Sequence, residues 1–384
     1  MSTHTFPGTE TTSATDVARA AGRRTAGLVL GAVVLSALFV LSYGYALHAP
    51  RPHGLRLDVA GTSASPIATA LDHAQPGAFR VHEVADAGAA RHDLENTTAY
   101  GALVVPVTGP LTIMTAGAAG LPAQQAATAA LRAVATTDHR AVVTTDVVPV
   151  SAADRVGQSS FVYEIGLLIP GVIGSVGFYL VGRRARLWVR VGAATAYAVF
   201  AAALGVLVLD GSFGALTGSP GTLLLTGMLA AAAFVLSLAA LHVVFGLPGT
   251  GIAAAALLVV GNAVNGSTVP IPFLPDGYRQ LALWLPNAAA VRAFRNDVYF
   301  HDHALGRPLL TLTTWVVAAL TVIAVADRVH LRRRRRNPSL HATIHSTPLL
   351  TRRRHGRHEL PVHRRAGERP ARQPRRQALL RWPV

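Results

Sequence analysis

Long apolar runs alternate with polar segments along this chain of 384 residues. A helix needs about 20 apolar residues to cross the ~30 Å hydrocarbon core of a membrane, and five runs reach or approach that length. A sixth run is shorter because Asn262, Asn265 and Gly266 interrupt it, so it either crosses as a short span or re-enters at membrane depth. The pattern predicts an all-α polytopic membrane protein with six transmembrane helices. The predicted segments are Ala26–Leu47, Phe161–Gly182, Val189–Leu209, Gly221–Gly246, Gly251–Val264 and Leu309–Ala326.

The first apolar run follows Arg23 and Arg24, as it would in a secretory signal peptide or in an uncleaved anchor. The run is longer than the apolar region of a signal peptide, and no small-residue cleavage site follows it. We therefore interpret residues 26–47 as a transmembrane anchor helix.

Residues 48–158 have a mixed polar pattern that differs from the rest of the chain. Runs rich in β-branched residues predict strands, and the segments between them have helical patterns. Strands that alternate with helices predict a small α/β domain between the first and second spans. The predicted strands are Gly54–Ala60, Phe79–Val84, Tyr100–Val107 and Ala141–Val150, and the predicted helices are Pro66–Ala74, Ala87–Leu94 and Pro122–Ala135.

The composition agrees with a membrane protein, because only 14% of the residues are charged and the mean hydropathy is +0.38. The chain has no cysteine, which excludes disulfides, thiolate metal sites and cysteine nucleophiles. It also has no lysine, which excludes a phosphate-binding loop of the Walker A type. Its usage of Ala, Arg and Gly is typical of a bacterial genome of high GC content.

The basic charge is concentrated in one tail. Residues 328–384 hold 17 arginines against Glu359 and Glu368, a net charge of +15, while the other 327 residues carry +1. Arginines also precede the first span and lie between the second and third spans, and cytoplasmic loops are enriched in such residues. The pattern predicts a multi-pass protein of the bacterial plasma membrane, with both termini in the cytoplasm and residues 48–158 outside.

These patterns divide the chain into successive regions. We expect a disordered cytoplasmic arm, an anchor helix, an extracytoplasmic α/β domain, a five-helix membrane domain with an outer re-entrant region at 265–300, and a basic disordered cytoplasmic tail. Their predicted bounds are 1–25, 26–47, 48–158, 159–327 and 328–384.

No group of residues predicts an enzyme, a metal site or a cofactor site. His301, Asp302 and His303 are interpreted as solvated loop residues, and His242 as a packed histidine on an apolar span. Glu164 lies near the outer end of the second span, where its carboxyl could snorkel to the membrane interface, and we interpret its placement as structural rather than functional. We expect no catalytic residue, no metal and no cofactor.

The arginine tail raises the question of nucleic-acid binding, but aromatic residues that could stack on bases are nearly absent from it, apart from Trp382. Next to a transmembrane helix, such a run attracts anionic lipid headgroups. Membrane lipids are therefore the expected partner, and nucleic acid is not. The predicted membrane-surface anchor is Arg332, Arg333, Arg334, Arg335 and Arg336.

The most distinctive stretch follows the broken fifth segment. A proline-rich turn precedes an amphipathic helix around residues 278–285, then Pro286 breaks the pattern before a second helix at Ala288–Tyr299. Tyr and Trp in such a helix suit the membrane interface. The plain interpretation is an interfacial hairpin that seals the outer face. The candidate site residues in this outer re-entrant region are Pro270, Pro272, Leu274, Pro275, Trp284, Pro286, Arg295 and Tyr299.

This stretch resembles permeases of the type-2 ATP-binding-cassette exporter class, especially the phage-infection-protein (Pip-like) branch of actinobacterial membrane proteins. The "fLP … wLP … lR … YF" pattern of that branch is similar to Phe273–Pro275, Trp284–Pro286 and Arg295–Phe300. Three shorter patterns support the resemblance over residues 25–330, while the arginine tail has no counterpart. They are Tyr100–Pro106, Leu111–Gly120 and Thr144–Gly157.

The resemblance implies a membrane permease subunit of an ATP-driven exporter, working as a homodimer or heterodimer with a separate ATPase subunit. A pathway with few charges suggests a hydrophobic or lipid-like substrate. The alternative is a non-transporting membrane scaffold or surface receptor whose exterior domain binds cell-envelope or protein partners. The predicted loop that contacts the ATPase carries Arg183, Arg184, Arg186 and Arg190.

Overall fold

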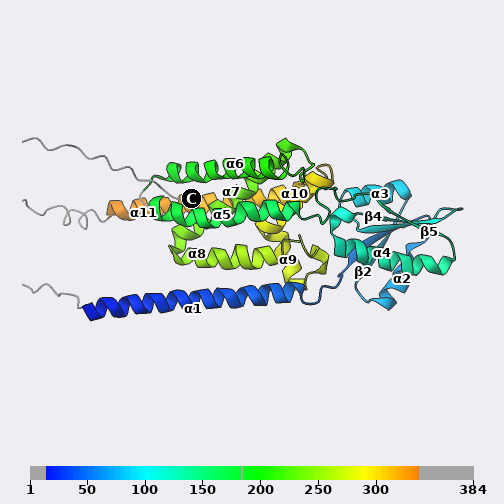
Figure 1. Cartoon of the computed structure of the whole chain (residues 1–384), viewed down its shortest axis with the longest axis horizontal. Coiled ribbons are helices and arrows are strands. Elements are labelled where there is room, and N and C mark those ends of the chain that lie inside the picture. Colours follow the sequence, from blue (N-terminus) through cyan, green and yellow to red (C-terminus); the bar gives the residue numbers. More distant parts are fainter. Residues whose placement is uncertain (1–13, 183–184, 337–384) are drawn as a thin grey trace, which may run out of the picture. The chain divides into compact units, whose positions relative to one another are not determined.

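The computed structural model describes residues 14–182 and 185–336, which are mostly helical and include one five-stranded sheet (Figure 1). Five of the described helices are long and apolar enough to cross a membrane. The prediction of a polytopic membrane protein is therefore confirmed. These helices are α1 (Ala14–Leu47), α5 (Ser159–Gly182), α6 (Leu187–Leu209), α7 (Pro220–Phe245) and α11 (Gly306–Arg336).

The two end helices are longer than predicted. Helix α1 begins at Ala14, within the region expected to be a disordered arm, because residues 14–25 are rich in the helix formers Ala and Arg and contain no proline. Helix α11 continues to Arg336, past the expected end of the membrane domain at residue 327, for the same reason. The rest of the predicted arm and tail, residues 1–13 and 337–384, lies outside the described residues.

The fifth predicted span is a short composite helix. It consists of α8 (Pro248–Ala253) and a π-helical segment, η3 (Ala254–Gly261), and it falls short of the length of a regular span. A π-helix has hydrogen bonds from residue i to i+5 instead of i+4, and such segments are frequent at functional sites. The described residues thus hold five helices that are long and apolar enough to cross a membrane, and this composite helix is not one of them.

The predicted α/β domain is a five-stranded sheet of order β2-β1-β3-β4-β5. Strand β1 pairs in parallel with β2 and β3, β3 pairs antiparallel with β4, and β4 pairs in parallel with β5. Strand β4 was not predicted, although its buried and half-buried residues alternate as in a half-buried strand. The strands are β1 (Leu55–Ala60), β2 (Phe79–Val84), β3 (Gly101–Val104), β4 (Leu111–Thr115) and β5 (Val142–Asp146).

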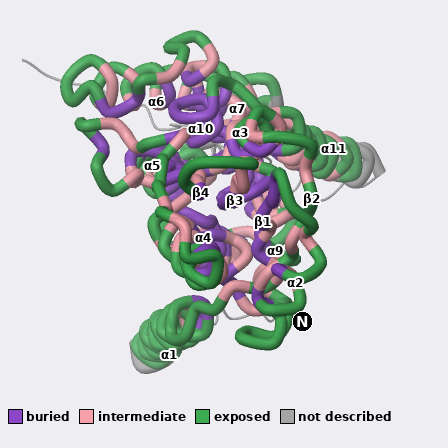
Figure 2. The backbone as a smooth tube through the Cα atoms, turned by 90° about the vertical axis from the view of Figure 1, so that its right-hand side faces the viewer, coloured by how far each residue is buried: buried purple, intermediate pink, exposed green. Residues whose placement is uncertain are grey.

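Three helices pack on this sheet, as predicted from their patterns. Helix α2 (Ala64–Ala74) begins after Ser63, whose hydroxyl accepts from a backbone N–H of the first turn. Asp86 caps α3 (Ala87–Glu95) in the same way. Helix α4 (Leu121–Ala135) packs its alanines and Leu131 against β3 and β4. The sheet shares one apolar core with α2 and α4, while Ala90 and Leu94 of α3 belong to a second core that continues into the membrane helices. Figure 2 shows the buried strands β1 and β3.

In the membrane domain, α7 is the most buried of the spans and packs against α5 and α6. Tyr163 of α5 fits between Gly205 of α6 and Gly227 of α7, where an added Cβ would lie only 2.3 Å and 2.0 Å from its ring and hydroxyl. The Tyr163 hydroxyl donates to the carbonyl of Ala202 at 3.0 Å. Helix α1 exposes most of its apolar side chains (Figure 2), as expected for a surface that contacts lipid.

Candidate functional site

Residues 265–300, the predicted outer re-entrant region, are hereafter called the outer segment. They form a series of short helices whose starts are set by prolines. Pro270 precedes the 3-10 turn η4 (Ile271–Phe273), Pro275 precedes α9 (Asp276–Trp284), and Pro286 is the first residue of α10 (Pro286–Tyr299). Proline favours helix starts because its fixed φ suits the first turn and its missing N–H would be unpaired there. Three of the four candidate prolines therefore set the path of this segment.

The same segment joins the sheet domain to the membrane helices. The carbonyl of Pro272 accepts from the backbone N–H of His53 at 2.9 Å. Pro270 lies against Gly120, where an added Cβ would be 2.9 Å from its ring. Leu274 is fully buried in the core that the sheet domain shares with this segment. These contacts connect the segment directly to the sheet domain.

Trp284 has a different environment from the other candidate residues. Its side chain is 72% exposed, while its carbonyl accepts from the indole Nε1 of Trp315 on α11 at 2.7 Å. Exposed tryptophans on membrane proteins are typical of the water interface.

A buried carboxylate caps helix α5. The two oxygens of Asp154 accept from the backbone N–H groups of Gln158 and Ser159, at 2.8 Å and 2.9 Å, and from the hydroxyl of Tyr299. Burial raises the pKa of Asp154, but the hydrogen bonds from Ser159, Tyr299 and the backbone outweigh it and hold that pKa below its usual value. Burial raises the pKa of Tyr299, so its hydroxyl stays protonated and donates.

Arg295 holds the loop that follows the fifth apolar segment. Its guanidinium donates to the carbonyls of Gly266 and Ser267, at 3.1 Å and 3.2 Å. The side-chain amide of Gln158 donates to the same Ser267 carbonyl at 3.2 Å. Gly266 has a φ of +80°, which glycine adopts without strain. Arg295 and Tyr299 thus join α10 to the loop and to the start of α5.

Glu164 is buried inside the helix bundle and does not extend to the protein surface, so the interpretation based on snorkelling was wrong. Its side chain is fully buried, and its Oε1 accepts from Asn287 Nδ2 at 2.7 Å. Asn287 is also fully buried and donates to the carbonyl of Leu257 in the π-helix at 3.2 Å. The Asn287 amide is a hydrogen-bond partner within the protein, so the Glu164 carboxyl does not need water as its partner.

This polar contact depends on close approach of the π-helix. An added Cβ at Gly261 would lie 2.2 Å from Asn287 Oδ1, so only glycine fits there. Among the described side chains, Glu164 Oε2 and Asn287 Oδ1 are buried without a hydrogen-bond partner. Buried polar atoms without a partner are uncommon in folded proteins, and each calls for an explanation. The cluster of Glu164, Asn287 and Gly261 is hereafter called the buried polar cluster.

The other end of the bundle holds the residues predicted to contact an ATPase. Arg186 is exposed at the start of α6, and Arg190 is half-buried beside a cavity of about 240 Å³ that His242 also lines. His242 is packed as expected, with Nε2 2.7 Å from Thr250 Oγ1 and its ring stacked on Tyr179. Arg183 and Arg184 lie outside the described residues. The backbone of Arg332–Arg336 belongs to α11.

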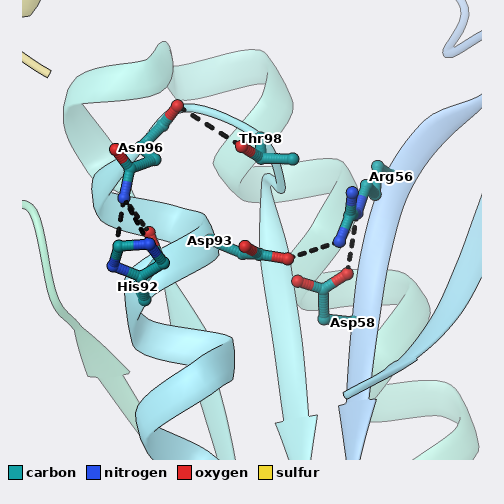
Figure 3. A network of polar contacts seen from close by, with 6 residues as sticks. All are labelled: Arg56, Asp58, His92, Asp93, Asn96 and Thr98. Atoms are coloured by element: carbon teal, nitrogen blue, oxygen red, sulfur yellow. Dashed lines mark hydrogen bonds and ion pairs between the residues drawn. The ribbon is translucent and has the colours of Figure 1, made fainter. Parts of the chain in front are cut away.

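The sheet domain has its own polar cluster, shown in Figure 3. Arg56 of β1 donates to Asp58 at 2.9 Å and to Asp93 of α3. Asp58 is fully buried. Burial raises the pKa of Asp58, and Arg56 opposes that shift. Because Arg56 pairs with both carboxylates, the cluster is a structural link between β1 and α3.

Sequence reasoning missed several residues of these clusters. Asn287 and Asp154 were not singled out, although Asp154 belongs to the segment Thr144–Gly157 that carries the family resemblance. For Asn287, a polar residue directly after Leu285-Pro286 within an otherwise apolar stretch was the available signal. Neither residue had a partner that spacing along the chain could reveal.

The fold and these clusters define a multi-pass membrane protein with a folded α/β domain. Comparisons with models of known families, with curated proteins and with solved structures gave no match.

Proposed function

We propose that this chain is the membrane permease subunit of an ATP-driven exporter, for a hydrophobic or lipid-like substrate. The observation that carries the proposal is the buried polar cluster, in which the Glu164 carboxyl meets Asn287 beside a π-helix. Ionisable residues inside a membrane are costly and mark the paths of substrates or ions. Interrupted helices form the binding sites of many transporters. A scaffold needs neither feature.

The composite helix Pro248–Gly261 acts as a sixth crossing in this proposal. Near one end, Thr250 contacts His242 close to the end of α7, while beyond the other end Ser267 contacts Gln158 at the start of α5. Fourteen residues of helix span about 21 Å at 1.5 Å per residue, less than the ~30 Å hydrocarbon core. The buried helix α10 fills part of the remaining depth, which supports a short crossing.

The orientation follows from the arginine bias. With six crossings, Arg186, Arg190 and the basic residues after α11 lie on the cytoplasmic side of a bacterial plasma membrane, as do both termini. The sheet domain and the α9–α10 segment then lie outside. We propose the domain bounds expected from the sequence, with α1 and α11 extended at their cytoplasmic ends.

ATP hydrolysis belongs to a separate subunit in this proposal, since the chain has no lysine for a Walker A loop. Cytoplasmic elements available for that subunit are the exposed start of α6 at Arg186 and the turn between α7 and α8 at Leu247, which is 51% exposed. Assembly as a dimer and contact with membrane lipids complete the expected partners.

Site-specific crosslinking tests this proposal. A photoreactive amino acid placed at Arg186 or Leu247 of the full chain in its own cells should capture a nucleotide-binding ATPase, identified by mass spectrometry. The same residue at Ser212, in the loop between α6 and α7, is the control and should not capture it. Capture of no ATPase from either cytoplasmic position would overturn the proposal.

A scaffold or surface receptor is the second candidate, favoured by apolar residues on the open side of the sheet domain. Val107 is fully exposed in the loop before β4, and Val143 is 48% exposed on the edge strand β5. Exposed sheet edges accept an additional strand from a partner. Val143→Glu should abolish the activity of a receptor but leave ATP turnover of an exporter unchanged.

A further inference from the structure

A cavity between the sheet domain and the outer segment is lined by three arginines. It has a volume of about 340 Å³, within the range of small-molecule sites, and Arg292, Arg295 and Arg307 face it together with Tyr100 and Asn296. Arg292 and Arg295 come from α10, and Arg307 from the first turn of α11. None of the residues that line this cavity is acidic.

The positive charge in this cavity has no paired anion among the described residues. Arg295 is 91% buried, and its Nε has no hydrogen-bond partner, as is also true of Arg292 Nη2. Arg292 Nε donates only to the carbonyl of Ala288, at 3.1 Å. None of the three arginines forms an ion pair with a described carboxylate. A buried charge without a partner is costly, so the arrangement calls for an anion.

The pKa shifts of Arg292 and Arg295 agree with positive charges that lie close together. Burial lowers the pKa of Arg292, and the charge of Arg307 lowers it further. Burial also lowers the pKa of Arg295, against the charges of Tyr100, Tyr299 and Asp154. Asp154 does not neutralise Arg295 by direct bonding, because its oxygens accept from Tyr299, Gln158 and Ser159.

We propose that this cavity binds the phosphate of an anionic phospholipid headgroup. Guanidinium groups bind phosphate oxygens through paired hydrogen bonds, and three of them line this cavity. The rest of the lining is largely apolar and includes Ile271, Leu283 and Phe300, which suits the glycerol and acyl portions of a lipid.

The position of the cavity, near the expected surface of the membrane, supports a lipid as the source of the phosphate. Leu283, which lines the cavity, precedes the exposed Trp284, and Arg307 precedes the apolar part of α11. Exposed tryptophans lie at the headgroup level of a membrane. This inference does not rest on the transport proposal, because a bound headgroup can be measured without transport.

Native mass spectrometry of the full chain provides the test, with phosphatidylglycerol and phosphatidylcholine as probes. We expect wild-type protein to retain phosphatidylglycerol, and R292Q/R307Q to bind it at least tenfold more weakly, because two charged hydrogen-bond donors are lost. Arg91→Gln is the matched control, since Arg91 is an exposed arginine of the sheet domain that pairs with Glu95, and it should bind as wild type. Equal retention by wild type and R292Q/R307Q would overturn the proposal.

A second arm distinguishes the source of the phosphate. Inorganic phosphate at millimolar concentration should compete only weakly with phosphatidylglycerol, because it lacks the apolar portion. Complete displacement by inorganic phosphate would assign the cavity to a soluble anion and contradict the lipid proposal. If R292Q/R307Q does not fold, R307Q alone replaces it, because Arg307 is exposed, and it should weaken retention severalfold.

Discussion

The hydroxyl of Tyr299 donates a hydrogen bond to the carboxylate of Asp154, which is 145 residues away along the chain. Asp154 caps the start of α5, and Tyr299 ends α10. The contact therefore fixes the outer segment against the first span that follows the sheet domain. It also brings together two of the segments on which the family resemblance rests.

Removing the Tyr299 hydroxyl should destabilise the fold. We expect Tyr299→Phe to lower the free energy of unfolding by about 1.5–3 kcal/mol, because a buried hydrogen bond to a charged group is lost. Thermal unfolding of the purified chain in detergent measures this change. Tyr45→Phe is the control, since the Tyr45 side chain is 58% exposed, and it should have little effect. Equal stability of the two variants would contradict the assigned contact.

The Asp154 carboxylate should make the stability of the fold depend on pH. The folded-state pKa of Asp154 is lower than its unfolded-state value of about 3.9, so its contribution is fully present above that value and is lost as the pH falls through the folded pKa. The difference in unfolding free energy between wild type and Asp154→Asn should be constant at neutral pH and shrink below about pH 4. Denaturation curves between pH 7 and pH 3 measure it, and a difference that grows on acidification would refute the assignment.

The buried polar cluster requires glycine at residue 261. Gly261→Ala would place a Cβ 2.2 Å from Asn287 Oδ1, and we expect a loss of about 1–3 kcal/mol in stability. Gly251→Ala is a matched control in the preceding helix, because an added Cβ there meets no atom within 4 Å. That variant should be neutral or more stable by up to about 1 kcal/mol. Melting curves measure the stability of both variants. Equal stability of Gly261→Ala and Gly251→Ala would disprove the close approach of the π-helix to Asn287.

The absence of cysteine allows the proposed topology to be tested with single cysteines. Cysteines at Thr137 in the sheet domain and at Ser212 after α6 should react with a membrane-impermeant maleimide added to intact cells. A cysteine at Arg186 should react only after the membrane is opened. All three positions are exposed, so access depends on the side of the membrane and not on burial. Labelling of Arg186→Cys in intact cells would refute the orientation.

Local patterns predicted most of the elements, because each depends on residues close together in the chain. Strand β2 has the predicted bounds Phe79–Val84, and the three sheet-domain helices lie within a few residues of prediction. Strand β4 was missed because its five residues alternate too briefly to stand out from the surrounding loop. The π-helix within the fifth segment has no signature in hydropathy alone.

The contacts of the candidate sites could not be predicted in the same way. Glu164 and Asn287 are 123 residues apart, and only the packing of α5, α10 and the π-helix brings them together. Because the sequence does not show that Asn287 is its partner, the Glu164 carboxyl was expected at the membrane interface, where an unpaired charge is stable. The arginines of the cavity were visible in the sequence, but their shared cavity and their lack of acidic partners were not.

ATP turnover tests the central proposal most directly. The full chain, purified from its own membrane without added ATPase and reconstituted in lipid, should carry a partner subunit that hydrolyses ATP. Glu164→Gln keeps the size of the side chain and its contact with Asn287 but replaces the ionisable carboxyl with an amide that cannot take up or release a proton, so it should change that turnover at least severalfold while the chain stays folded. A preparation without ATP hydrolysis, or one with the same turnover in wild type and Glu164→Gln, would contradict the proposal.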